Sequence, residues 1–130
     1  MRKSIAQHVK AMARGILVLD ENLFSLSQAL ERKNIRIIKV ESGMKDEFIQ
    51  KHTLPGRIFV TNNSKDFVKG AKSFEYGIIS TENIKSKDPE YLSDLISKEI
   101  IKNKLWSKLN GFILTLRDSG KSSFKELKND

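Results

Sequence analysis

The sequence predicts a single α/β domain of three layers, in which a central and mainly parallel β-sheet carries helices on both faces. Short apolar runs that suit buried strands alternate with segments whose apolar residues recur at helical spacing. This alternation is typical of parallel sheets, because each connection between parallel strands crosses one face of the sheet. The chain of 130 residues also has the size of one domain, and no Pro-, Gly- or Ser-rich stretch divides it.

Strands are predicted where runs of aliphatic and β-branched residues are too short for a helix. These runs are Ile16–Leu19, Ile35–Val40, Arg57–Thr61, Tyr76–Ser80 and Phe112–Arg117. We therefore expect one domain over residues 1–130, with a core of about 15–117 and a ragged, basic C-terminal end of about 118–130.

Helices are predicted where apolar residues recur at intervals of three and four. The predicted segments are an amphipathic helix over 4–13, helices over 23–32 and 46–51, a helical turn at 67–68, and a long helix from 89 to 109. Gly70 is expected to close the turn. Asp88 is expected to cap the long helix, since its carboxylate can accept from a free N–H group of the first turn.

The composition indicates a cytoplasmic protein that does not enter a membrane. The chain has no cysteine, so disulfides and thiolate metal sites are excluded. Its longest apolar runs, Gly15–Leu19 and Gly111–Leu116, are far shorter than the roughly 20 residues that span a bilayer. The first residues of the chain also lack the uninterrupted apolar segment of a signal peptide.

The chain is strongly basic, with a net charge of +8 and a pI near 9.7. Such a balance favours a polyanionic partner, because lysine and arginine that neutralise phosphates release counterions. Lys65, Lys69 and Lys72 follow the third predicted strand and are candidates for contacts with RNA phosphates. A solvated lysine-rich surface without a ligand is the alternative.

Acidic and amide side chains follow the ends of the first three predicted strands. Asp20, Glu21 and Asn22 follow the first, Asp46 follows the second, and Thr61, Asn63 and Asp66 end or follow the third. Parallel strands bring their C-terminal ends to one edge of a sheet, where ligands bind. Oxygen donors without sulfur favour a hard cation, Mg²⁺ or Mn²⁺. A cation held there can activate water for attack on a phosphate, as metal-dependent nucleases require.

Each of these acids also has a purely structural explanation. Asp20 or Glu21 could cap the helix that follows, while Asp46 and Asp66 could favour the first turns of their own helices through the macrodipole. Their occurrence together at one predicted edge favours the metal site over the separate explanations.

Three stretches of the chain resemble the PIN-like domain superfamily, in particular its short prokaryotic members related to PIN-domain ribonuclease toxins. They are Leu17–Asn22 (LVLDEN), Asp46–Ile49 (DEFI) and Arg57–Phe67 (RIFVTNNSKDF), of which the third is the most specific. The likeness covers about half of the chain, from Ile16 to Ile84.

The resemblance implies a PIN-like fold with metal-dependent endoribonuclease activity, often as the toxin of a toxin–antitoxin pair. It implies that Asp20 is the central metal ligand, that Asp46 is a second ligand, and that Asp66 completes the site or positions water. Glu21 and Asn63 are weaker candidates, and Asn22 and Thr61 are supporting residues. RNA is then the expected substrate and an antitoxin the expected protein partner, while the sequence leaves a homodimer open.

Two other interpretations compete with the nuclease. Many PIN-like relatives carry an acid at or near the position of Asn63, so the chain could be an inactive PIN-like module that binds RNA or a protein. A response-regulator receiver also begins with an acidic pair after an apolar strand. The third strand argues against that class, because a receiver has a phosphoaccepting aspartate where this strand ends in Thr61, Asn62 and Asn63.

Overall fold

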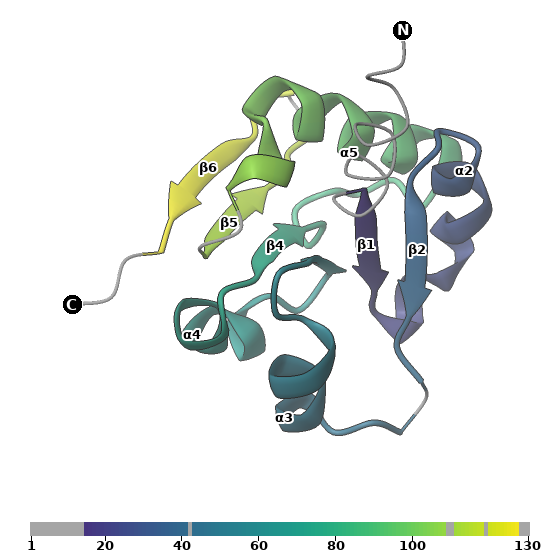
Figure 1. The fold of residues 1–130 in the computed structure, drawn as a ribbon. Coiled ribbons are helices and arrows are strands. Elements are labelled where there is room, and N and C mark those ends of the chain that lie inside the picture. The colour runs from purple at the N-terminus through teal and green to yellow at the C-terminus, as the bar shows by residue number, and fades with distance from the viewer. Residues whose placement is uncertain (1–14, 42, 109–110, 119, 128–130) are drawn as a thin grey trace, which may run out of the picture.

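The computed structural model describes residues 15–41, 43–108, 111–118 and 120–127. Within these ranges the chain forms one open sheet with helices packed against it (Figure 1). The amphipathic helix predicted over 4–13 and the predicted end of the long helix at Leu109 lie outside the described residues.

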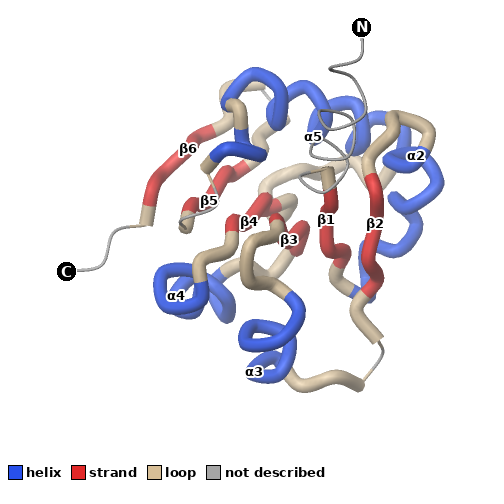
Figure 2. The backbone as a smooth tube through the Cα atoms, in the orientation of Figure 1, coloured by secondary structure: helices blue, strands red, loops and turns tan. Residues whose placement is uncertain are grey.

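The sheet has six strands in the order β2-β1-β3-β4-β5-β6 (Figure 2). The strands are β1 (Ile16–Leu19), β2 (Arg36–Lys39), β3 (Ile58–Thr61), β4 (Gly77–Ser80), β5 (Phe112–Thr115) and β6 (Ser123–Glu126). The first five run parallel, and β6 pairs antiparallel with β5. The predicted α/β domain with a mainly parallel sheet is therefore confirmed.

The helical segments are η1 (Glu21–Leu26), α2 (Ser27–Glu31), α3 (Asp46–Phe48), η2 (Ile49–Thr53), α4 (Lys65–Phe74), α5 (Pro89–Asn103) and η3 (Leu105–Ser107). None of the helices in the described parts of the chain is long and apolar enough to cross a membrane.

Alternate residues of the central strands pack into two separate cores. In β1, Leu17 and Leu19 join a cluster with residues of η1, α2 and α5, whereas Val18 joins a second cluster with residues of η2 and α4. The central strand β3 divides in the same way, with Phe59 in the second cluster. Because side chains of a strand alternate between its faces, helices cover both faces and the predicted three layers are confirmed.

The β1–β3 boundary is where the order of the sheet reverses. The chain first adds β2 on one side of β1 and then crosses to add β3 on the other. At such a switch point the connections leave in opposite directions and open a crevice at the C-terminal ends of the strands. The arrowheads of β1 and β2 in Figure 1 point toward the side of the molecule where α3 lies.

The region after β3 differs from the prediction. We expected one helical turn closed by Gly70, but α4 continues through Gly70 to Phe74 and ends at Glu75, whose φ is +54°. Gly70 is buried against the side chain of Gln50. Because glycine has no Cβ, the Gln50 side chain of η2 can pack against α4 at this position. Gly70 therefore allows a contact between two helical segments and does not end α4.

Other boundaries also differ from the predictions. The segment predicted as one helix over 23–32 is a 3-10 helix followed by α2, with a kink at Leu23. The long helix is capped by Asp88 as predicted, but it ends at Asn103, and Lys104 then takes a positive φ of 52°. The predicted ragged end instead contains β6, where Phe124 packs against the ring of Phe112 at 5.6 Å between centroids.

We expect Gly70→Ala to destabilise the protein by about 1 kcal/mol, even though alanine favours helices. An added Cβ would lie 1.7 Å from Gln50 Oε1 and 2.8 Å from the hydroxyl of the buried Tyr76. Gln50 would have to leave this position. Urea unfolding of Gly70→Ala, Gln50→Ala and the double variant checks the cause, because Gly70→Ala should cost less once Gln50 is shortened. Equal costs in both backgrounds would contradict it.

Candidate functional site

The candidate site lies at the C-terminal ends of β1 and β3, at the switch point of the sheet. Asp20 directly follows β1, and Thr61 is the last residue of β3. The two strands are neighbours, and the N–H of Asp20 donates to Val60 O at 3.1 Å. The backbone therefore places the Asp20 carboxylate beside the residues that leave β3.

Both carboxylate oxygens of Asp20 accept hydrogen bonds. Oδ2 accepts from the Thr61 hydroxyl at 2.8 Å, and Oδ1 accepts from the N–H of Glu21 at 2.9 Å. The second bond makes Asp20 the N-cap of η1, so the structural explanation for this residue holds. The first bond goes beyond capping, because it fixes the carboxylate against the neighbouring strand.

The hydrogen bonds continue from Thr61 toward Asp66. The Thr61 oxygen accepts from the N–H of Asn63 at 3.0 Å, and Asn63 Nδ2 donates to Asp66 Oδ2 at 2.6 Å. Asp20 and Asp66 are thus joined through two residues of the β3–α4 turn. An aspartate in place of Asn63 would put a second carboxylate against Asp66 where the amide now donates.

Asp46 enters this site from a different connection, in the first turn of α3. Loss of surrounding water raises its pKa above the ordinary value, and the negative charges of Asp66 and then Asp20 raise it further. Asp66 and Asp20 therefore lie within electrostatic range of Asp46. Hydrogen bonds link Asp20 and Asp66 through Thr61 and Asn63, whereas Asp46 is related to them through charge.

Gln50 ties the segment that carries Asp46 to the helix that carries Asp66. Its Nε2 donates to the backbone oxygen of Asp66 at 3.3 Å, and its Oε1 accepts from the Tyr76 hydroxyl at 3.1 Å. The same hydroxyl lies 2.5 Å from Phe67 O, so Tyr76 anchors the contact in the core. Sequence reasoning missed Gln50, because nothing in its neighbourhood along the chain marks it.

The remaining predicted residues occupy different parts of this edge. Asn22 donates through Nδ2 to Asn62 Oδ1 at 2.9 Å, which makes a second link between the ends of β1 and β3. Glu21 contributes its backbone N–H to Asp20, while its side chain is exposed. Lys65 and Lys69 are exposed on α4, and the side chain of Lys72 lies outside the described residues.

Glu82 is a further acid at the same edge, just after β4. Its Oε1 accepts from the Ser64 N–H at 3.1 Å, from the Ser64 hydroxyl, and from the Ser80 hydroxyl at 2.9 Å. The bond from the Ser64 hydroxyl is the largest cause that lowers the pKa of Glu82. Ser64 stands at the N-cap position of α4, but its side chain makes no capping bond to that helix. The position of Glu82 after a strand end was the available signal.

The donors at this edge suit a hard divalent cation by type, since they are carboxylate, amide and hydroxyl oxygens. Their geometry is not that of a finished coordination group. Across the described residues, no set of three or more His, Asp or Glu side chains is arranged to hold a metal ion. The site thus has the right donor chemistry and a concentration of negative charge, without an assembled metal cage.

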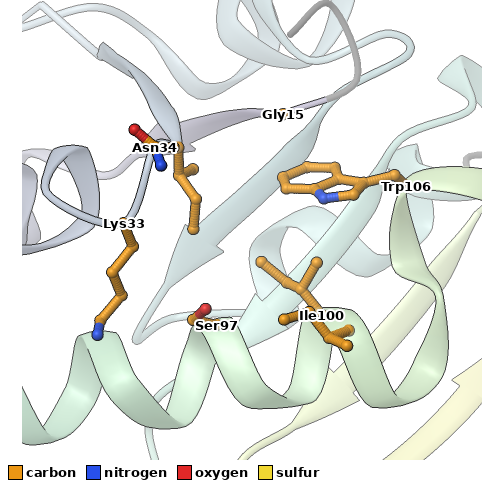
Figure 3. Close-up of a pocket in the computed structure, with 8 residues that line it drawn as sticks. Gly15, Lys33, Asn34, Ser97, Ile100 and Trp106 are labelled. Atoms are coloured by element: carbon orange, nitrogen blue, oxygen red, sulfur yellow. The ribbon is translucent and has the colours of Figure 1, made fainter. Parts of the chain in front are cut away.

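A separate hollow of about 330 Å³ lies at the opposite edge of the sheet, where β1 and β2 begin (Figure 3). Its lining includes Lys33, Ser97, Ile100 and Trp106. Trp106 is partly buried and packs against the first core cluster. The lining contains no carboxylate, so this hollow has no part in the acidic site.

Comparison of the chain with protein-family models, curated proteins and solved structures finds no match. The case for a function therefore depends on the geometry of this edge.

We expect Asp46→Asn to stabilise the metal-free protein at neutral pH by about 0.5 kcal/mol. The expected gain is small because the Asp46 carboxylate is exposed to solvent, which screens its interactions with other charges. A carboxyl whose folded pKa is raised destabilises the fold once it is charged, at pH values above that raised pKa. The gain should disappear as the pH falls and wild-type Asp46 becomes protonated.

Thermal melts of both proteins from neutral to acidic pH, in the presence of EDTA, check this expectation. Glu31→Gln, which neutralises an exposed acid on α2, is the control. If Asp46 mainly served its own helix, Asp46→Asn would lower the melting temperature.

Proposed function

We propose that this chain is a divalent-metal-dependent ribonuclease that hydrolyses phosphodiester bonds at the β1–β3 switch point. The observation that carries the proposal is the chain of hydrogen bonds that joins Asp20 to Asp66 through Thr61 and Asn63. The charges of Asp66 and Asp20 also raise the pKa of Asp46, which belongs to a third connection. Carboxyl groups whose pKa is raised in this way occur preferentially at functional sites.

The three acids have unequal roles in this proposal. Asp20 is the anchor, because Thr61 and the N–H of Glu21 already hold both of its oxygens in place. Asp66 and Asp46 would complete the ligand set from the two connections on either side. When bound, Mg²⁺ or Mn²⁺ supplies an activated water and neutralises charge that develops on the phosphate.

The basic surface supports RNA as the substrate. The chain carries a net charge of +8 despite its acidic site, and Lys65 and Lys69 are exposed on the helix that also carries Asp66. Such cations can hold the backbone of a nucleic acid beside the acids. A PIN-like relationship, a cytoplasmic setting and a toxin role with an antitoxin partner belong to this proposal as predictions.

One observation favours a second candidate, a non-catalytic module that binds RNA or a protein. Asn63 donates to Asp66 at 2.6 Å, which engages one of the oxygens that a metal would need. In this alternative the edge keeps its shape through hydrogen bonds alone. The receiver function remains disfavoured, because β3 ends in Thr61 and the hydroxyl of that residue donates to Asp20.

Titration with Mn²⁺ during thermal melting separates the two candidates. A metal at a hundredfold excess over its Kd stabilises the folded state by about 2.7 kcal/mol, which is several degrees in Tm for a chain of this size. We expect this stabilisation in the wild type and in Asp94→Asn, a control that changes an exposed acid on α5. It should be lost in Asp20→Asn.

Cleavage of RNA by the same proteins in Mn²⁺ then tests the chemistry. Asp20→Asn should lose activity while Asp94→Asn keeps it. A wild-type melt that does not respond to metal, or equal cleavage by the wild type and Asp20→Asn, would overturn the nuclease proposal.

A further inference from the structure

Phe48 is a large apolar side chain that the fold leaves at the surface. It ends α3, two residues after Asp46, and is 49% exposed. The next residue, Ile49, is only 3% exposed and seats this segment in the second core cluster. The packing of the segment therefore depends on Ile49 and leaves Phe48 free to serve another purpose.

Phe48 differs in this from the aromatic residues of the cores. Phe59 and Phe67 pack edge to face inside the second cluster, whereas Phe48 belongs to neither core cluster. Its ring contact is with His52, at 4.6 Å between centroids and an interplanar angle of 40°. His52 is itself exposed, so the pair forms an aromatic surface that is open to solvent.

An open hollow of about 420 Å³ adjoins this ring, lined by Glu41, Gly43, Met44, Lys45 and Phe48. Met44 packs against the second core cluster and gives the hollow a supported apolar wall. Gly43 adds no side chain that would fill the space, and a Cβ built there would meet nothing within 4 Å.

The charges around the hollow favour a phosphate on one side of the ring. Lys45 is exposed, and among the described residues it makes no ion pair. Lys51 and Glu47, which are also on this segment, neutralise each other at 2.8 Å. Glu41 is the opposing acid in the lining. An aromatic face with a neighbouring free ammonium group is the combination that holds an unpaired nucleotide.

We propose that Phe48 is a stacking platform for an unpaired RNA base, and that Lys45 contacts the adjoining phosphate. This inference rests on the proposed function for its substrate, and it narrows that substrate to RNA that offers an unpaired base to Phe48. Every base has a face that can stack on an aromatic ring, so the platform is tolerant of sequence. Bases in a duplex are already paired and stacked, which denies them to Phe48.

Binding measured without metal tests the platform separately from catalysis. Fluorescence anisotropy of a labelled single-stranded RNA in EDTA should give a Kd that rises about fivefold or more in Phe48→Ala. Phe48→Leu, which is apolar without a ring, should weaken binding similarly, whereas Phe48→Trp should keep it. Ile101→Ala is the matched control, because Ile101 is an exposed apolar residue on α5 at 74% exposure.

Two further measurements distinguish stacking from general attraction. Lys45→Gln should reduce the slope of log Kd against log salt by about 0.7, the value for one phosphate contact on a single strand. Affinity for a perfectly paired RNA duplex should be the same in the wild type and Phe48→Ala.

Loss of binding in Phe48→Ala but not in Phe48→Leu would overturn the stacking platform, and so would an unchanged Kd in both. A wild type that binds no single-stranded RNA would overturn it as well, and the surface would then be open to a protein partner. Failure of the nuclease proposal has a different signature. In that case the protein would neither be stabilised by Mn²⁺ nor cleave RNA, while the affinities for RNA measured in EDTA would be unchanged.

Discussion

The hydrogen bond from the Thr61 hydroxyl to the Asp20 carboxylate is the interaction on which the candidate site depends. It joins the ends of two adjacent parallel strands at the one place where the order of the sheet reverses. Thr61 is fully buried, so its hydroxyl has few other partners and its bond to a charged oxygen is strong. The same oxygen of Thr61 accepts from Asn63, which carries the arrangement on to Asp66.

The site also concentrates negative charge in a chain whose net charge is +8. Asp46 experiences this directly through its raised pKa, yet Gln50 holds its segment against α4. The core contact between Gln50 and Tyr76 therefore maintains an arrangement that electrostatics alone would spread apart. Such conflict between local favourability and overall arrangement is typical of functional sites. Phe48, two residues after Asp46 in the sequence, is also locally unfavourable, since its aromatic ring is exposed to solvent.

The sequence was most informative where local pattern and tertiary environment agree. Strands that are buried on both faces can be predicted from their continuous apolar runs. The bounds of β1 are the predicted ones. Once a parallel sheet is expected, its topology predicts that Asp20 and Asp66 lie at the same edge. The hydrogen bonds through Thr61 and Asn63 that link the two acids agree with this prediction. The PIN-like relationship stays a prediction that came from short motifs.

The features that sequence reasoning missed depend on partners distant along the chain. Gly70 looks like a helix stop, but its role is set by the side chain of Gln50. The strand β6 has exposed polar residues around Phe124, and its pairing with β5 is what makes it a strand. The sequence places Glu82 shortly after the fourth predicted strand. It does not indicate that the hydroxyls of Ser64 and Ser80 hold the carboxylate of Glu82.

The proposed nuclease requires one divalent cation to bind among Asp20, Asp46 and Asp66. Paramagnetic broadening of backbone amide NMR signals by substoichiometric Mn²⁺ tests this most directly, because it reports where the ion lies and requires no catalytic activity. We expect the signals of residues 20–22, 46–47 and 63–66 to broaden first and together, and Asp20→Asn to abolish the effect. Broadening scattered over the exposed acids of α2 and α5, or centred on Glu82 alone, would contradict it.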